Sequence, residues 1–198
     1  MLHLRPADYR LMPWKDGGGS TTEIAIAPAG ASLSEPFLWR VSSARVEASG
    51  PFSRFPGQAR ALLLLEGAGL LLTIEGQGRQ RLKHPGQVAT FAGDDAAEAT
   101  LIQGPCTDFG LIYDPRRIQA TLEWLSLGRE PTAINLAPTT LLFAPWGAVG
   151  VDPLGLQLEH RDCLWFGNPG QPEKPSAKLN VRAAQGTTPL VLVSIRPL

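Results

Sequence analysis

Residues 61–74 read ALLLLEGAGLLLTI, two apolar runs separated by the turn-forming sequence EGAG at residues 66–69. The whole segment is shorter than the roughly 20 apolar residues that a membrane-spanning helix needs. Two short apolar runs joined by a glycine-containing turn are typical of a β-hairpin. We therefore predict strands at Ala61–Leu65 and Leu70–Ile74.

The same pattern of short apolar runs and turns extends in both directions from this hairpin. The 21 glycines and 18 prolines of the 198 residues are spread along the chain, and both exceed average usage, which is about 7% and 5%. This distribution predicts an all-β protein with little helix. The further predicted strands are Thr22–Ala27, Leu38–Val46, Arg79–Leu82, Val88–Phe91, Ala97–Ile102 and Phe109–Tyr113.

Residues 115–127 fit either a helix or a strand. A helix would begin with Pro115 in its first turn and would place Ile118, Leu122 and Leu125 on one face. However, apolar and polar residues also alternate from Ile118 to Trp124, and the β-branched and aromatic content favours a strand. We predict a strand. A longer connection is expected at Gly167–Ser176, GNPGQPEKPS, because its prolines cannot donate ladder hydrogen bonds.

The second half of the chain repeats the first in outline, which indicates a duplicated unit. Three pairs of segments correspond in order: Leu62–Leu65 with Thr140–Phe143, Val88–Phe91 with Cys163–Phe166, and Leu111–Tyr113 with Val191–Val193. The sequence LEG that closes a strand and the PG that opens a later one are typical of cupin jelly rolls. We therefore predict a double cupin, two jelly-roll-like β-barrels in one chain. Its N-terminal lobe is expected at residues 1–117, with a C-terminal lobe at residues 118–198 packed against it.

Charge and composition limit the expected partners. Lys plus Arg and Asp plus Glu both number 18, so the basic face that nucleic acid or an anionic membrane requires is not expected. The first residues contain no apolar run of the length that a signal peptide has. Cys106 and Cys163 lack a CxxC spacing and suit a reducing compartment. We therefore expect a cytoplasmic protein that binds neither nucleic acid nor membrane.

The residues that bind metals in enzymes are sparse in this sequence. The three histidines are His3, His84 and His160, and none belongs to the His-x-His pair with a nearby Glu that would direct several ligands to one point. No Gly-x-Ser-x-Gly nucleophile motif occurs either. We predict neither a metal nor another cofactor.

The segment from Pro13 to Ala27, PWKDGGGSTTEIAIA, is the first candidate for a binding site because three glycines let a ligand or backbone come close. In the strand Leu38–Val46, alternation places Arg40 and Ser42 on the same face. Glu23 is expected to share a face with Thr21, Ala25 and Ala27, and to lie near Arg40. A buried arginine needs an anionic partner, so Arg40 pairs either with Glu23 or with a carboxylate of a ligand.

These residues fall into a set of motifs that resembles the HutD/Ves family. The motifs recur in order over residues 13–117 and are Trp14-Lys15-Asp16-Gly17-Gly18-Gly19 with Thr21, Glu23 and Ile24; Trp39-Arg40-Val41-Ser42 with Ala44; Gly50-Pro51-Phe52-Ser53-Arg54-Phe55-Pro56-Gly57 with Arg60; Leu65-Glu66-Gly67; and Asp108-Phe109 before Arg116-Arg117. The resemblance implies a bicupin of the bacterial cytoplasm without a known catalytic metal. It also implies a regulator, associated in some members with histidine utilisation, that senses a small anionic catabolite. This chain has Asp16 where the family usually has Asn, and Gly110 where Asn commonly follows Asp-Phe.

The leading hypothesis is a non-catalytic binder of a small anionic metabolite. Arg40 would pair with a carboxylate or formyl oxygen, Lys15 would add charge, and Trp14 or Trp39 would form an apolar wall. The full set of expected ligand-binding residues is Trp14, Lys15, Asp16, Thr21, Glu23, Trp39, Arg40, Ser42, Arg60 and Asp108.

Two alternatives remain open. The first is a metal-independent cupin enzyme, an isomerase or lyase on a small carboxylate, with Glu23 or Asp108 as general base. The second is a protein-interaction module in which Trp124 or Trp146 mediates self-association into a homodimer.

Overall fold

The structure, a computed structural model, describes residues 1–167 and 177–198; the predicted loop Gly167–Ser176 lies outside the described residues except for Gly167. The chain divides into two compact units. The N-terminal lobe is Tyr9–Ile118, and the C-terminal lobe combines Gln119–Leu198 with Met1–Asp8. The first eight residues therefore differ from the predicted boundary. They join the C-terminal lobe because strand β1 (Leu2–Leu4) pairs with β17 (Cys163–Phe166).

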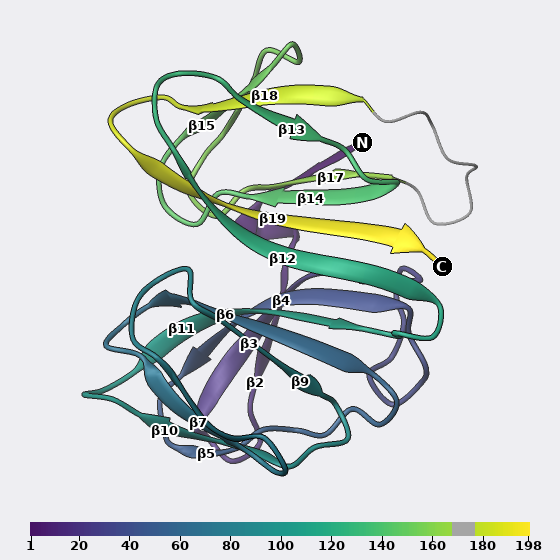
Figure 1. The fold of residues 1–198 in the computed structure, drawn as a ribbon, viewed down its shortest axis with the longest axis vertical. Coiled ribbons are helices and arrows are strands. Elements are labelled where there is room, and N and C mark those ends of the chain that lie inside the picture. Colours follow the sequence, from purple (N-terminus) through teal and green to yellow (C-terminus); the bar gives the residue numbers. More distant parts are fainter. Residues whose placement is uncertain (168–176) are drawn as a thin grey trace. The chain divides into compact units, whose positions relative to one another are not determined.

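Two antiparallel sheets make up the N-terminal lobe (Figure 1). The larger sheet holds, in spatial order, β2 (Arg10–Pro13), β3 (Gly19–Ala27), β4 (Trp39–Val46), β11 (Cys106–Tyr113), β6 (Ala59–Glu66) and β9 (Val88–Ala92). The smaller sheet holds β5 (Gly50–Pro51), β10 (Ala97–Leu101), β7 (Leu70–Ile74) and β8 (Gly78–Leu82).

The C-terminal lobe also has two sheets. One runs β1, β17, β14 (Thr139–Phe143), β19 (Thr188–Pro197) and β12 (Ile118–Leu127). The other runs β13 (Thr132–Asn135), β18 (Lys178–Ala183), β15 (Val149–Asp152) and β16 (Leu156–Leu158). The part of the chain that the structure describes contains one helix, the 3-10 turn η1 (Pro6–Asp8).

Equivalent strands occupy equivalent places in the two lobes, as the sequence repeat predicts. In the N-terminal lobe β6 lies between β11 and β9, and in the C-terminal lobe β14 lies between β19 and β17. These are the strands that contain the three pairs of corresponding segments. The smaller sheets match as well, because β5-β10-β7-β8 and β13-β18-β15-β16 have the same connectivity. The duplicated unit predicted from the sequence is therefore confirmed.

The segment that allowed either a helix or a strand is strand β12. Its alternating apolar residues, rather than the helical spacing, determine its conformation. The predicted strands at Ala61–Leu65, Leu70–Ile74 and Val88–Phe91 are also present, each within two residues at either end.

One prediction about strand faces is wrong. Glu23 pairs with Ser42, but after a β-bulge between Glu23 and Ala25 the next pair is Ala25 with Val41. The extra residue in a bulge moves all later side chains to the opposite face. Ala25 therefore shares the face of Val41, while Glu23 stays on the face of Arg40 and Ser42.

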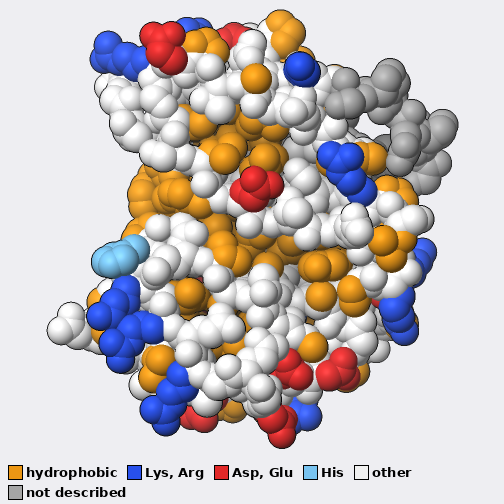
Figure 2. Space-filling model, in the orientation of Figure 1, with side chains coloured by type: hydrophobic (Ala, Val, Ile, Leu, Met, Phe, Trp, Pro, Cys, Tyr) orange, Lys and Arg blue, Asp and Glu red, His pale blue; other side chains and the backbone are white. Residues whose placement is uncertain are grey.

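Charged side chains of both signs lie on the surface. On the face drawn in Figure 2, Lys and Arg side chains lie among Asp and Glu side chains, in keeping with the net charge of zero. Among the described residues, no helix has the length and apolar character needed to cross a membrane.

Candidate functional site

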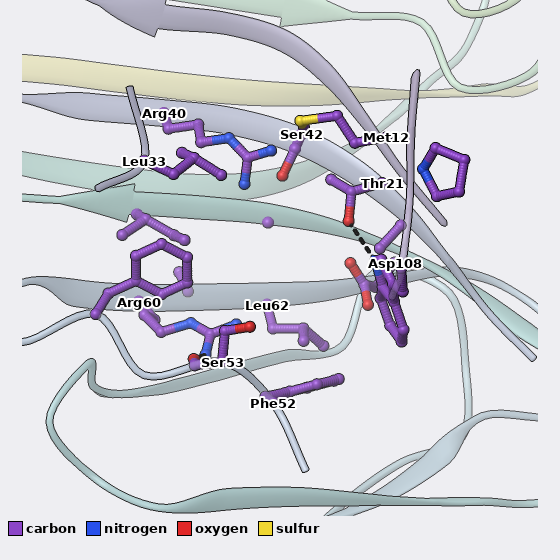
Figure 3. Close-up of a pocket in the computed structure, with 17 residues that line it drawn as sticks. Met12, Thr21, Leu33, Arg40, Ser42, Phe52, Ser53, Arg60, Leu62 and Asp108 are labelled. Atoms are coloured by element: carbon purple, nitrogen blue, oxygen red, sulfur yellow. Dashed lines mark hydrogen bonds between the residues drawn. The ribbon is translucent and has the colours of Figure 1, made fainter. Parts of the chain in front are cut away.

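A pocket of about 210 Å³ opens on the larger sheet of the N-terminal lobe (Figure 3). Three central strands supply its floor in matched cross-strand rows. Arg40 of β4 and Arg60 of β6 both pair with Ile112 of β11, and Ser42 and Leu62 both pair with Gly110. Because side chains alternate along a strand, these residues all point to the same side.

Arg40 is the most deeply placed cation of the pocket. The residue is only 5% exposed, and its Nε donates a hydrogen bond of 2.7 Å to Oε2 of Glu23. Its Nη2, however, is buried and has no hydrogen-bond partner. A buried polar group is almost always paired, and leaving one unpaired costs about 1 to 3 kcal/mol or more for a charged group. The pocket therefore contains an unused donor on a cationic side chain.

Arg60 lies on the opposite side of the pocket, with Phe52 and Ser53 (Figure 3). Its Nη1 donates to the backbone carbonyl of Ser53 at 2.9 Å. Its guanidinium also lies over the rings of Phe52, Phe55 and Phe91, with centroid distances of 5.4, 5.5 and 4.8 Å. The pKa of Arg60 is lowered to about 10, chiefly by burial and to a smaller extent by the charge of Arg40, against the opposing effect of Asp108. These contacts fix the cation in place but do not neutralise it.

Asp108 lies on β11, further along the pocket and near Thr21 (Figure 3). The residue is only 4% exposed. Burial raises the pKa of Asp108 to about 7, although the charge of Arg60 and a backbone hydrogen bond at Ala44 both oppose the increase. At neutral pH the carboxyl is therefore protonated in a large fraction of molecules.

The charges around the pocket do not balance. Arg40 and Arg60 are two cations, whereas Glu23 is an anion paired with Arg40, and Asp108, with a pKa raised to about 7, is only partly ionised at neutral pH. Like charges that share a buried site disfavour each other's charged forms. The arrangement therefore has room for one more negative charge, next to the free Nη2 of Arg40.

Trp14 closes the pocket at the end near Thr21. Its Nε1 donates a hydrogen bond of 2.8 Å to Oγ1 of Thr21, which Figure 3 shows as a dashed line. A Cβ on Gly19 would collide with the backbone carbonyl of Arg45 and would lie 3.2 Å from the Trp14 ring. The glycine at this position thus allows the indole to lie against the backbone.

Six of the ten residues expected to bind ligand line this pocket: Trp14, Thr21, Arg40, Ser42, Arg60 and Asp108. Four do not. Lys15 and Asp16 are exposed in the turn between β2 and β3, where Asp16 accepts a hydrogen bond from the backbone of Gly18 at 3.0 Å. Trp39 is buried on the other face of β4, and Glu23 reaches the pocket only through Arg40.

Apolar residues outside the predicted set complete the lining, among them Met12, Leu33, Phe52, Phe55 and Ile112. Asp108, Gly110 and Ile112 alternate along β11 and so lie on one face of the strand. The position of Gly110 and Ile112 in the pocket therefore follows from that of Asp108. Met12, Leu33 and Phe55 lie on loops or an edge strand. Their approach to the pocket depends on tertiary packing that local patterns do not encode.

None of the three histidines lines this pocket. Nε2 of His3 is 2.9 Å from Oδ2 of Asp162 in the C-terminal lobe, whereas His84 and His160 are exposed in turns. Among residues 1–167 and 177–198, no three His, Cys, Asp or Glu side chains gather in a way that would hold a metal ion. Trp124 and Trp146 pack against each other edge to face, with ring centroids 5.4 Å apart.

The fold and the duplicated topology define the class of protein: it is a double cupin. An oxalate decarboxylase from Lactobacillus farciminis, crystallised as a formate complex, superimposes with a TM-score of 0.62, covering 100% of this chain and 87% of that chain. Its sequence is only 8% identical, so this likeness concerns the fold alone.

The particular family follows from closer similarities. The HutD family model matches residues 6–187, and this chain belongs to the HutD family. A curated relative, the uncharacterized 21.2 kDa protein in the hutC 3' region of Pseudomonas putida, is 38% identical over 164 residues, or 81% of this chain and 84% of the relative. Protein Ves of Citrobacter koseri is 40% identical over 100 residues, about half of each chain.

Two solved structures are similar along nearly the whole chain. A conserved protein from Pseudomonas aeruginosa PAO1 has a TM-score of 0.89 at 36% identity, covering 98% of both chains. HutD from Pseudomonas fluorescens SBW25, described for a formate condition, has a TM-score of 0.82 at 35% identity, covering 100% of this chain and 98% of that chain. The resemblance inferred from the motifs of residues 13–117 is therefore confirmed.

Proposed function

We propose that the protein is a non-catalytic binder of a small anionic metabolite, carrying a carboxylate or formyl group, that acts in the cytoplasm in a regulatory role. The observation that carries this proposal is the free Nη2 of Arg40 in the wall of the pocket. An oxygen of a carboxylate would accept a hydrogen bond from that nitrogen. A charge-assisted bond of this kind is both shorter and stronger than a neutral one.

The charge and size of the pocket support the same ligand class. Two guanidinium groups face a carboxyl that is partly protonated at neutral pH, so a guest that carries a negative charge restores the balance. The volume of about 210 Å³ lies below the several hundred Å³ of pockets that hold drug-sized ligands. A ligand of a few non-hydrogen atoms fits this space best.

The relatives suggest where such a ligand arises. One is described by its place beside hutC, and another is HutD itself, described for a formate condition. We therefore propose that the ligand is an anionic intermediate or product of histidine catabolism, whose concentration the protein senses or buffers.

Substitution of Arg40 tests the binding role. A charge-assisted hydrogen bond contributes about 1.5 to 3 kcal/mol, so Arg40→Ala should weaken the binding of formate or acetate by roughly tenfold or more. Arg40→Lys keeps a positive charge beside Glu23 but lacks the second nitrogen, and it should also bind more weakly. Isothermal titration calorimetry measures both affinities.

A matched control is Arg54→Ala. Arg54 lies in the same lobe, with its side chain 59% exposed and 3.8 Å from Glu75, and it does not line the pocket. This variant should keep the affinity of the unmodified protein. Equal affinities in the Arg40 and Arg54 variants would refute the role of Arg40.

A second function is favoured by Asp108. A buried carboxyl with a pKa of about 7 inside a pocket has the properties of a general acid or base. We therefore propose, as the alternative, a metal-independent isomerase or lyase acting on a small carboxylate. Steady conversion of small carboxylates by chelator-treated protein, followed by NMR and lost in Asp108→Asn, would establish it. Binding of a carboxylate without its conversion would refute the enzyme and support the non-catalytic binder.

A further inference from the structure

A second cavity, of about 230 Å³, lies next to the pocket within the N-terminal lobe. Small and apolar residues such as Val46, Ala48 and Pro51 form much of its lining, together with Asp16. The two cavities share two lining residues, Trp14 and Phe52. These aromatic side chains therefore stand between the pocket and the second cavity.

Trp14 is held in this position by several contacts. Its indole nitrogen donates to Thr21 at 2.8 Å, its backbone nitrogen donates to the carbonyl of Gly19 at 2.9 Å, and its ring lies against the bare backbone of Gly19. A side chain fixed at both its polar and its apolar parts loses little further freedom when a ligand binds. It is therefore suited to act as a rigid wall.

The wall lies at the far end of the pocket from Nη2 of Arg40, the nitrogen without a partner. Thr21, the partner of Trp14, pairs across the sheet with Ala44, which is four residues along β4 from Arg40. A ligand whose carboxylate meets Nη2 of Arg40 and whose chain extends along the strands consequently approaches the indole ring. Its length is limited by that ring.

We propose that Trp14, assisted by Phe52, determines the length of the ligand by separating the anion pocket from the second cavity. This inference rests on the proposed function, because it takes Arg40 as the anchor of the carboxylate. Removal of the indole joins the two spaces. The enlarged pocket then offers apolar surface to additional methylene groups.

The test is a titration with straight-chain monocarboxylates from formate to hexanoate, followed by calorimetry. In the unmodified protein, affinity should stop increasing, or fall, once the chain reaches the indole. In Trp14→Ala, each further methylene should strengthen binding by roughly fourfold until the second cavity is filled, the factor expected for one buried CH₂. Trp14→Phe keeps an aromatic wall and should retain the preference for short acids.

Two further variants keep the test valid if Trp14→Ala does not fold. Phe52→Ala opens the same wall from its other residue and should relax the length limit in the same direction. Trp124→Ala removes a tryptophan from the C-terminal lobe and should leave the length preference unchanged. Melting curves establish which variants are folded before they are titrated.

The outcomes separate this inference from the proposed function. If the unmodified protein binds short carboxylates but the folded Trp14→Ala and Phe52→Ala variants keep its length preference, the inference is wrong and the proposed function stands. If the unmodified protein binds no member of the series, both are overturned.

Discussion

Asp108 is the residue through which pH acts on the pocket. It is buried near Arg60, yet its pKa is raised to about 7 because desolvation outweighs the attraction of Arg60 and a backbone hydrogen bond at Ala44. In the unfolded chain an aspartate titrates near 3.9. The folded protein therefore binds one more proton than the unfolded chain between these two values.

This difference predicts a pH dependence of stability. Because the folded pKa is raised, the stabilising contribution of protonated Asp108 is complete below about pH 4 and is lost as the pH rises toward 7. Between these two pH values, Asp108 lowers the free energy of unfolding by about 1.4 kcal/mol per pH unit, the value for one proton. In Asp108→Asn this contribution to the slope should vanish, and the variant should gain stability relative to the unmodified protein from pH 5 to pH 8. Urea unfolding at several pH values measures the effect. If the free energy of unfolding has the same pH dependence in both proteins, the prediction is wrong.

The pocket residues differ in how well the sequence predicts them. Arg40 and Ser42 follow from alternation in a strand, because residues two apart lie on the same face. Lys15 and Trp39 were expected in the pocket and lie outside it. Alternation from Arg40 already places Trp39 on the opposite face of β4. The turn that exposes Lys15 does not follow from residue type, since it depends on the exact ends of β2 and β3.

At the scale of single elements, the hairpin of β7 and β8 shows how a glycine fixes a strand boundary. Gly69, just before β7, has a φ of +99°, and a Cβ at this position would collide with the backbone carbonyl of Leu82. Gly76 in the turn that follows has a φ of +74°, but a Cβ there would meet no atom within 4 Å. A side chain at Gly76 would thus meet only an unfavourable backbone conformation, whereas one at Gly69 would also meet a steric collision.

Substitution by alanine should therefore affect the two positions differently. Gly76→Ala should cost about 1 kcal/mol, the typical penalty for a left-handed conformation without a clash. Gly69→Ala should cost more, about 3 kcal/mol or above, because the start of β7 must also move away from the backbone carbonyl of Leu82. Chemical denaturation of both variants measures the difference. A smaller effect at Gly69 than at Gly76 would show that the strand boundary is not fixed in this way.

Apolar strands are easier to predict from the sequence than short strands and strand pairing. The apolar strands β6 and β7 are evident from pattern, whereas the short strands β1, β2 and β5 are not, because two to four residues carry no periodicity. Their pairing comes from neighbours distant in sequence, as in the pairing of Leu2 with Trp165. The β-bulge in β3 was missed for the same reason, since it is a feature of register.

At the scale of the whole molecule, one topology occurs twice with different interiors. In the N-terminal lobe, the paired strands β6 and β11 bring Leu62 together with Gly110 at the pocket. In the C-terminal lobe, the position on β19 that corresponds to Gly110 of β11 holds Leu190, a buried member of the apolar core. A glycine leaves space where a leucine fills it. Duplication thus supplied two similar frameworks, of which the N-terminal one holds the charged pocket.

The most direct test is a crystal structure of the full chain with acetate or formate. We expect the anion in the pocket of the N-terminal lobe, with one oxygen about 2.7 to 2.9 Å from Nη2 of Arg40. The leucine core of the C-terminal lobe should hold none. An anion bound elsewhere, while Nη2 of Arg40 stays without a partner, would contradict the account.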